Sequence, residues 1–382
     1  MAQPPFEISD DDRYSRLQLI PWWDQRKLQQ SRVLVVGAGA LGNEVLKNLA
    51  LVGVGHIEIV DFDRIENSNL SRAVLFRERD AGRFKADVAA ESLRQLNPHI
   101  RVDAIVGNVM TEVGLGRVRA ADVVIGCLDN REARLWVNRM CWKVTRPWID
   151  GGIQEINGVA KVFRPPEGPC YECGMTDADY RLIQLRYSCP LLQQSDIQQG
   201  RVPTSPTIAS IIGGLQVQEA LKLLHCLPPS DATAFVFNGV ANQFYRTRYP
   251  LKPDCLSHET YEVIDPIGLT AEARAAELLE SSDAQLVLDR DWVCSLECQQ
   301  CKLSTPVERP LQSVHHSDAT CIECGQTMQP KAIHRVDAAS PWANRTLRQL
   351  GIPDFDIVKI ETAGGTRYYQ LEMIGAGSRL TN

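Results

Sequence analysis

Residues 32–42 read RVLVVGAGALG, a short β-branched run that leads directly into the pattern G-x-G-x-x-G. The run predicts a buried strand, and residues 41–51 predict the helix that follows it. Gly37, Gly39 and Gly42 allow a tight turn in which backbone amides can approach phosphate groups at the positive end of the helix. This stretch therefore predicts a strand–turn–helix unit that binds a nucleotide.

Strand and helix patterns alternate beyond this unit. The sequence predicts strands at 57–61, 122–127 and 158–164, helices at 85–97, 130–144 and 207–224, an irregular crossover with one short helix at 174–206, and a closing hairpin at 234–237 and 243–249. Strands and helices that alternate at this spacing form parallel sheets covered by their connecting helices. We therefore predict an α/β fold with a Rossmann-like, mostly parallel sheet and helices on both faces.

The length of 382 residues is enough for one large α/β domain and a smaller appendage. We expect an N-terminal helical arm at 1–30, a nucleotide-binding domain at 31–265 and a C-terminal region at 266–382. Within the last region, the predicted parts are a helix at 269–280, a small cysteine-rich module at 294–324, a short helix at 342–350 and a final β-hairpin at 355–373.

The composition, 44% hydrophobic and 23% charged residues, is that of an ordinary globular protein. A formal net charge of −6 argues against a nucleic-acid partner, which usually requires a surplus of basic residues. No apolar run is long enough to cross a membrane, so no membrane partner is expected. The polar, acidic N-terminus does not read as a secretory signal, and we expect a reducing, cytoplasmic compartment.

Charged and polar residues follow the glycine loop at positions where they could bind parts of a nucleotide. Asp61 lies nineteen residues beyond Gly42, at the end of the next predicted strand, where a carboxylate can accept hydrogen bonds from ribose hydroxyls. Asn69, Arg72 and Lys85 come next, and such a cluster suits the neutralisation of a triphosphate better than the binding of NAD. A further carboxylate, at position 129, ends another predicted strand, where it could hold Mg²⁺. The expected cofactors are therefore ATP and Mg²⁺.

Six motifs, taken in order, resemble the ThiF/MoeB/ubiquitin-activating superfamily over roughly residues 12–265: RYSR (13–16), GAGALG (37–42), DFD (61–63), SNLSR (68–72), FKAD (84–87) and CLDN (127–130). The resemblance implies that residues 31–265 form a ThiF-type adenylation domain. Such a domain uses ATP to adenylate the C-terminal glycine of a small ubiquitin-like protein.

Site residues follow from the same resemblance. It implies that Asp61 binds the ribose, that Asn69, Arg72 and Lys85 contact phosphates, and that Asp129 holds Mg²⁺. Three further residues of these motifs, Ala40, Asp63 and Asn130, are assigned to the nucleotide site. Arg16 matches an arginine that, in homodimeric members, reaches into the ATP site of the neighbouring subunit, which implies a homodimer.

Cys189, in RYSCPLL, is the candidate nucleophile. It lies in the predicted crossover, sixteen residues after Cys173, and has arginines on both sides in sequence. Modifier-activating enzymes, which the stretches CLDNREARLWVNRM and PWIDGGIQEINGVAKVF resemble, place their thioester cysteine in this crossover. We therefore predict thioester formation on Cys189 and transfer to a ubiquitin-conjugating-type enzyme. The alternative of a purely structural thiol remains open.

Three other functions remain open at this point. The first is a sulfur-carrier protein adenylyltransferase of the MoeB/ThiF type that needs no thioester. The second is a non-catalytic scaffold that retains the fold, against which the presence of Arg72, Lys85 and Asp129 argues. The third is an NAD dehydrogenase, which the glycine pattern alone would also fit.

Two metal sites are predicted from cysteine spacing and resemblance. Cys298/Cys301 and Cys321/Cys324 are C-x2-C pairs separated by nineteen residues, the spacing of a zinc ribbon. A third pair, Cys170 and Cys173, resembles a zinc knuckle that relatives complete near the end of the domain. The matching residues here are Cys255 and His258. We expect two structural Zn²⁺ ions, with Cys294, His315 and His316 as weaker candidate ligands for the second.

Overall fold

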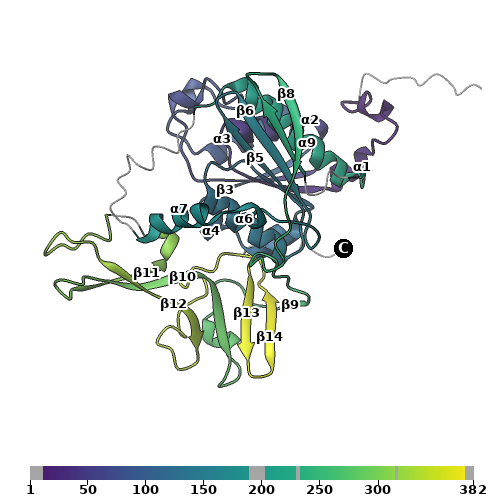
Figure 1. The fold of residues 1–382 in the computed structure, drawn as a ribbon. Coiled ribbons are helices and arrows are strands. Elements are labelled where there is room, and N and C mark those ends of the chain that lie inside the picture. The colour runs from purple at the N-terminus through teal and green to yellow at the C-terminus, as the bar shows by residue number, and fades with distance from the viewer. Residues whose placement is uncertain (1–11, 189–202, 229–232, 315–316, 375–382) are drawn as a thin grey trace, which may run out of the picture.

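The computed structural model describes residues 12–188, 203–228, 233–314 and 317–374. Within these ranges the protein has two lobes, each built around one β-sheet (Figure 1). The larger lobe holds the purple, blue and teal elements together with the green α9 (Pro206–Leu224) and β8 (Gln243–Arg248), and the smaller lobe holds the lighter green and yellow strands of the C-terminal region.

The larger sheet has eight strands in the order β3-β2-β1-β4-β5-β6-β7-β8. Strands β3, β2, β1, β4 and β5 run parallel, and β6, β7 and β8 return in antiparallel fashion. Their bounds are β1 Arg32–Val36, β2 His56–Asp61, β3 Arg101–Val106, β4 Val123–Gly126, β5 Trp148–Gln154, β6 Asn157–Phe163, β7 Thr233–Asn238 and β8 Gln243–Arg248.

Helices cover both faces of this sheet. α2, α3 and α9 pack into one apolar cluster with β1 and β2, whereas α4, α5 and α6 pack into a second cluster on the opposite face. The helices are α1 Gln25–Gln30, α2 Ala40–Val52, α3 Lys85–Leu96, α4 Val109–Glu112, α5 Leu115–Ala120, α6 Arg131–Lys143, α7 Asp177–Ser188 and α9 Pro206–Leu224. The short 3-10 helices are η1 Leu17–Leu19, η2 Asn67–Asn69, η3 Glu78–Asp80, η4 Glu172–Gly174, η6 Ala275–Leu278 and η7 Leu311–Ser313. The predicted α/β fold is confirmed.

Two strands of the larger sheet, β3 and β5, are absent from the sequence-based prediction. β3 carries partly exposed side chains at its sheet edge, so it lacks a continuous apolar run. β5 contains Gly151 and Gly152, which weaken the strand pattern even though Trp148 and Ile149 are fully buried.

The smaller lobe is a six-stranded sheet in the order β11-β10-β13-β14-β9, with β12 also paired to β10. Its strands are β9 Ile264–Pro266, β10 Gln285–Glu297, β11 Ser304–Pro310, β12 Gln329–Asp337, β13 Ile357–Thr362 and β14 Gly365–Gln370. The predicted final hairpin is confirmed as β13 and β14. Because β9 pairs with β14, the segment around the expected boundary at 265 joins this second sheet. The division into 1–30, 31–265 and 266–382 itself stays a prediction.

The helices predicted at 269–280 and 342–350 are wrong. Only η6 and a series of turns form there. The two segments lie side by side, with a bridge between Arg274 and Thr346, and backbone amides of each donate to carbonyls of the other. The alanine-rich composition favours a helix locally, but the backbone groups find partners in the other segment instead.

A buried ion pair of the smaller lobe makes contacts to the larger lobe. Arg290, on β10, donates to the carbonyl of Met110 in α4, and its guanidinium lies 4.9 Å from the ring centroid of Trp136. The same guanidinium lies 3.4 Å from Oδ2 of Asp356, whose Oδ1 accepts a hydrogen bond of 2.6 Å from the amide of Leu115. Burial raises the pKa of Asp356, and the charge of Arg290 opposes that shift. The two side chains therefore depend on each other.

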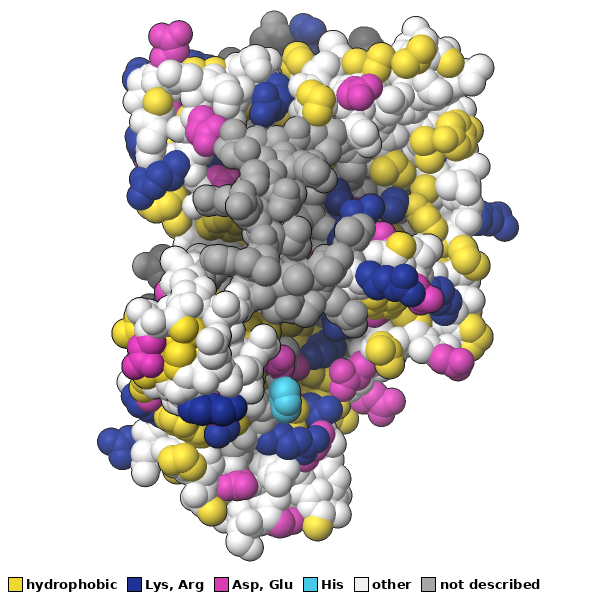
Figure 2. Space-filling view, turned by 60° about the vertical axis from the view of Figure 1, so that its left-hand side comes forward, with side chains coloured by type: hydrophobic (Ala, Val, Ile, Leu, Met, Phe, Trp, Pro, Cys, Tyr) yellow, Lys and Arg dark blue, Asp and Glu magenta, His cyan; other side chains and the backbone are white. Residues whose placement is uncertain are grey.

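On the face shown in Figure 2, the described charged residues of both signs are interspersed over both lobes. Among the helices that the structure describes, none combines the length and the apolar character needed to span a bilayer.

Removing either member of the Arg290–Asp356 pair should destabilise the fold. We expect Asp356→Ala and Arg290→Ala each to lower the free energy of unfolding by about 3 kcal/mol, because each leaves a buried charge without its partner. Urea denaturation measures both effects. The double variant should lose less than the sum of the single losses. Arg101→Ala, at an exposed arginine, is the control. The interpretation would be contradicted if each single variant lost no more stability than this control and the loss in the double variant equalled the sum of the two.

Candidate functional site

The turn between β1 and α2 is built from close backbone contacts. Gly37 has φ of +100° and donates its amide to the carbonyl of Val60 at 2.8 Å. A Cβ at Gly37 would lie 2.4 Å from the carbonyl oxygen of Cys127, and a Cβ at Gly42 would lie 2.0 Å from that of Gly37. At Gly39, by contrast, a Cβ would meet nothing within 4 Å, since this position faces open space. Two glycines are thus required for packing, and the third keeps space free.

Asn43 connects this turn to the segment that carries the cationic residues. Its fully buried amide donates to the carbonyls of Ala38 and Gly39, at 2.8 and 3.0 Å. Its Oδ1 accepts from the amide of Leu75 at 2.9 Å. Asn43 therefore positions the loop relative to the chain just after Arg72. The sequence shows only an asparagine one residue past the glycine pattern, which is too weak a signal to identify this role.

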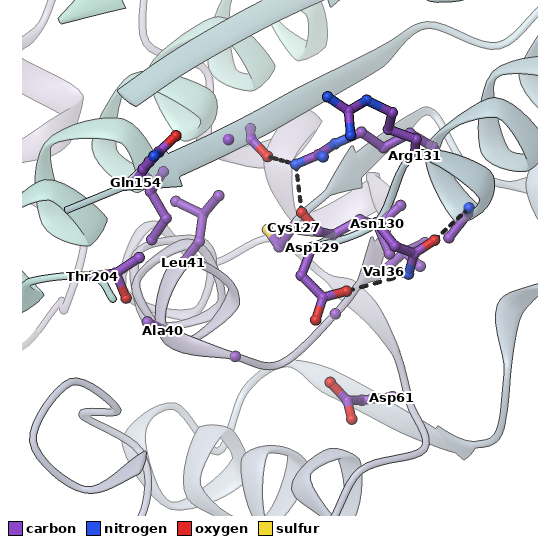
Figure 3. A pocket seen from close by; sticks show the side chains of 18 of the residues that line it. Val36, Ala40, Leu41, Asp61, Cys127, Asp129, Asn130, Arg131, Gln154 and Thr204 are labelled. Carbon is purple, nitrogen blue, oxygen red and sulfur yellow. Dashed lines mark hydrogen bonds between the residues drawn. The ribbon is translucent and has the colours of Figure 1, made fainter. Parts of the chain in front are cut away.

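A large cavity opens beside the turn, with a volume of about 1170 Å³. Figure 3 shows the carboxylates of Asp61 and Asp129 near the loop that precedes Ala40. Ten of the predicted site residues line the cavity: Gly37, Gly39, Ala40, Asp61, Asp63, Asn69, Arg72, Lys85, Asp129 and Asn130. Gly42 lies behind the turn, and Arg16 is exposed next to η1; neither is among the lining residues.

Asp61 is held rigidly at the end of β2. Its two carboxylate oxygens accept from the amides of Ala38 and Asp63, at 2.7 and 2.8 Å. Burial raises the pKa of Asp61, while the amide of Ala38 and the charge of Lys85 oppose the shift. Lys85 lies at the start of α3, and its ammonium is 2.8 Å from Oδ2 of Asp63. Asp63, which the sequence analysis assigns to the nucleotide site, therefore also holds Lys85 in place.

The remaining predicted residues occupy helix ends around the cavity. Asn69 closes η2, where its Oδ1 accepts from the amide of Glu66 at 3.1 Å. Arg72 donates to the carbonyl of Ser68 at 2.9 Å. Asn130 caps α6, and its Nδ2 donates to Oδ1 of Asp129 at 3.2 Å. The Asp129 carboxylate is exposed at this helix start, where it is accessible to a ligand in the cavity.

Two of the described cysteines line the cavity: Cys127, which lies against Gly37, and Cys170 of the first cysteine cluster. Burial raises the pKa of the Cys127 thiol far above the ordinary range, and the nearby Asp150 raises it further. Cys127 is therefore a poor nucleophile. Cys189, the predicted nucleophile, lies outside the described residues.

Sequence reasoning missed the far end of the cavity. Lys161, on β6, lies there with its ammonium 5.3 Å from the ring centroids of both Tyr171 and Tyr249. Burial lowers the pKa of Lys161. Nearby, Nε of Arg134 donates to Oδ1 of the buried Asp150 at 2.9 Å. A lysine within the apolar strand sequence GVAKVF was the available signal for this end.

The first predicted metal cluster is assembled as expected from its four residues. Sγ of Cys170 lies 3.7 Å from that of Cys173 and 3.5 Å from that of Cys255, and Nε2 of His258 lies 3.4 Å from Sγ of Cys173. A tetrahedral zinc with sulfur at about 2.3 Å would separate neighbouring sulfurs by about 3.8 Å, which these distances match. Burial lowers the pKa of His258 and favours the neutral ring that binds metals. The ring also stacks on Trp142, with centroids 3.9 Å apart.

The second cluster joins Cys298, Cys301, Cys321 and Cys324. Sγ atoms of Cys298 and Cys324 are 3.6 Å apart, too far for a disulfide and close enough for shared zinc. The amide of Cys301 donates to Sγ of Cys298 and helps to lower its pKa to about 7, which favours the thiolate. All four ligand atoms of each cluster lie within 4.8 Å of one another, so both clusters could hold a metal ion.

A parallel sheet with a glycine loop, a carboxylate at the end of β2 and cations around one cavity defines a nucleotide-binding α/β protein. A comparison with family models identifies which one. The chain belongs to the ThiF family, whose model matches residues 12–257.

Curated relatives span several activities. The chain is 34% identical to the sulfur carrier protein adenylyltransferase of Thermus thermophilus over 64% of this chain and 89% of the relative. It is 32% identical to the adenylyltransferase and sulfurtransferase MOCS3-1 of Drosophila pseudoobscura pseudoobscura, over 67% of this chain. It is 41% identical to SUMO-activating enzyme subunit 2 of Dictyostelium discoideum over 38% of this chain and 22% of the relative. The chain spans only about half, 55%, of the fly protein's length.

Among solved structures, the fold is similar to E. coli MccB crystallised with ATP. The TM-score is 0.53 at 25% sequence identity, and the match covers 66% of this chain and 76% of MccB.

Substitution of Gly37 should mainly affect folding stability, whereas substitution of Gly39 should mainly affect ligand binding. We expect Gly37→Ala to lower the free energy of unfolding by about 2 kcal/mol, because alanine there is strained and meets Cys127. Gly39→Ala should change stability by about 1 kcal/mol or less, yet weaken binding of MgATP because its methyl group enters the space left for the ligand. Urea denaturation and calorimetric titration with MgATP measure the two effects. If both variants lost the same stability and the same affinity for MgATP, these separate roles of Gly37 and Gly39 would be contradicted.

Proposed function

We propose that this protein adenylates the C-terminal carboxylate of a small ubiquitin-like or sulfur-carrier protein with ATP. The observation that carries the proposal is the single cavity shared by the glycine loop, Asp61, Arg72, Lys85 and Asp129. Membership of the ThiF family supports it, as do relatives named sulfur carrier protein adenylyltransferase and SUMO-activating enzyme subunit.

In the proposed reaction, an oxygen of the tail carboxylate attacks the α-phosphorus of ATP. The bond from phosphorus to the bridging oxygen breaks, and pyrophosphate leaves with the electron pair. Asp61 accepts from the ribose hydroxyls, and amides of the glycine loop approach the phosphates. Asn69, Arg72 and Lys85 stabilise the charge that develops on the phosphate oxygens. Lys85 is already aimed at the cavity by its ion pair with Asp63.

The residues around Asp129 suit Mg²⁺, because its exposed carboxylate offers oxygen ligands at the edge of the cavity. Mg²⁺, when bound, would neutralise part of the phosphate charge. Arg16 is exposed and is not among the residues that line the cavity, which fits the predicted role in the site of a second copy in a homodimer. Sedimentation of the purified chain tests that assembly.

The more specific proposal is that Cys189 captures the acyl group as a thioester and passes it to a conjugating enzyme. In this step the thiolate attacks the acyl carbon and AMP leaves. Its support is the position of Cys189 in sequence and the similarity to the SUMO-activating subunit. The competing proposal is a sulfur-carrier adenylyltransferase without a thioester, which the similarity to the Thermus protein favours.

We further propose that both cysteine clusters hold structural Zn²⁺. Four ligands fill each tetrahedral set, so neither site keeps an open position for catalysis. The second cluster lies in a small apolar group around Val293, Leu296 and Met328, so zinc would contribute much of the folding free energy of that module.

Exchange of labelled pyrophosphate into ATP tests the central proposal, with a panel of small proteins whose chains end in glycine as substrates. We expect exchange with at least one of them. Arg72→Ala, Lys85→Ala and Asp129→Ala should each reduce the rate by about a hundredfold or more, because each removes charge stabilisation from the transition state. Lys27→Ala, on the exposed face of α1, is the matched control and should keep the wild-type rate.

A non-reducing gel of the same reactions separates the two products. A thiol-sensitive conjugate that is lost in Cys189→Ala, but kept in the exposed control Cys226→Ala, supports the thioester. Exchange without any such band supports the sulfur-carrier alternative. Absence of exchange with every candidate, in a protein that binds MgATP, would refute adenylation of these tails.

Metal analysis of the purified chain should find two zinc ions. We expect Cys173→Ser and Cys321→Ser to lose one ion each, because each removes one ligand of a separate cluster. Cys226→Ser, whose thiol is in neither cluster, should keep both. If the Cys321→Ser protein still bound two zinc ions, Cys321 would not be a ligand and the proposed four-cysteine site would be wrong.

A further inference from the structure

Among the residues that the structure describes, Lys161 in the cavity wall has no carboxylate paired with its ammonium. Within the described part of the chain, its contacts are the rings of Tyr171 and Tyr249, and its ammonium has no hydrogen-bond or ion-pair partner there. The carboxylates closest to it in the fold are already engaged: Asp150 by Arg134, and Asp179 by Arg131 at 2.8 Å. A partly buried ammonium in this state is expected to bind an anionic group of a ligand.

The register of the sheet fixes how far Lys161 lies from the glycine loop. Val36, Gly126, Asp150 and Lys161 are successive partners on β1, β4, β5 and β6, so they form one row across the sheet. Neighbouring strands are about 4.8 Å apart, so Lys161 lies about 14 Å from the residue that precedes the loop. The ribose-side carboxylate, Asp61, lies one strand further away, at the end of β2.

We propose that Lys161, with Tyr171 and Tyr249, forms a subsite for an acidic side chain close to the C-terminus of the protein substrate. This inference rests on the proposed adenylation. The reacting carboxylate must reach the α-phosphate beside the glycine loop, and an extended chain advances about 3.3 Å per residue. Lys161 therefore contacts a residue within about four positions of the C-terminus of the protein substrate.

The position of Lys161 favours the tail over the nucleotide as its partner. The ribose and phosphate groups have their own proposed partners in Asp61 at the end of β2, Arg72 in the turn after η2 and Lys85 at the start of α3. Lys161 lies on the opposite side of β4 and β5 from that set. The flanking tyrosines add flat apolar walls, which suit the methylene groups of an aspartate or glutamate side chain lying between them.

Short peptides ending in Gly-Gly, with one glutamate moved through the preceding positions, test the subsite. The full-length protein is assayed with MgATP for peptide-dependent pyrophosphate exchange. We expect one glutamate position to raise kcat/KM by about tenfold over its glutamine counterpart. Lys161→Met should abolish that preference, and Lys161→Glu should transfer it to lysine at the same position. The KM for ATP should stay unchanged in both variants.

Lys331→Met, which removes a lysine on the exposed face of the smaller lobe, is the matched control and should retain the preference. Exchange without a glutamate preference, or a preference that survives in Lys161→Met, would overturn the subsite while leaving the proposed function intact. A raised KM for ATP in Lys161→Met, with peptide selectivity unchanged, would assign the lysine to the nucleotide instead. Absence of exchange with any peptide and with any small protein would overturn the adenylation proposal, and the subsite with it.

Discussion

Close backbone packing at the β1–α2 turn is the constraint on which the site depends. Carbonyl oxygens of Gly37 and Cys127 occupy the volume that side chains at Gly42 and Gly37 would need, so β1, β4 and α2 can approach each other only through glycine. Because these elements lie so close together, the amide of Ala38 donates to Asp61. The start of α2 points towards the cavity for the same reason. Asn43 then transmits the position of the turn to the chain beyond Arg72 through buried hydrogen bonds. The groups proposed to bind phosphate, which come from three separate segments, are thereby held in one geometry before any ligand arrives.

The central strands β1 and β4 of the larger lobe were predictable because their burial shows in their own sequence. β1 and β4 are continuous apolar runs bounded by glycine, and parallel strands buried on both faces must read this way. The smaller lobe was less predictable because its backbone pairing is non-local. The segment 269–280 has the composition of a helix, yet it pairs with residues around Thr346. β10 has three charged residues at its middle, and Arg290 among them is buried only because Asp356 meets it from β13's start.

The first cysteine cluster and the far wall of the cavity are parts of one arrangement. Tyr171 lies between two of the cluster's cysteines, and Tyr249 precedes Cys255 by a few residues, so a shared ion would restrain both rings. Glu172 strengthens the same region, since its buried carboxylate accepts from Arg139, Tyr180 and Ser257. Those hydrogen bonds, led by the one from Arg139, outweigh burial and lower the pKa of Glu172. The C-x2-C spacing of Cys170 and Cys173 and the family resemblance predicted the four ligands of this cluster, but not that the cluster supports a wall of the cavity.

The cavity therefore has two halves that are specified by different means. Near β1, β2 and β4 it is built from turns, helix ends and backbone amides, which impose strict residue patterns such as the glycine loop. Near β6 it is built from side chains that project from an antiparallel strand and from loops, as with Lys161 and Tyr249, where many residue types would preserve the fold. This difference explains why the nucleotide-site motifs that the sequence reveals belong to the first half. Under the proposed function, it also explains how one fold can serve different protein tails: the half proposed for the nucleotide is constrained by its backbone, and the half proposed for the tail is free to change its side chains.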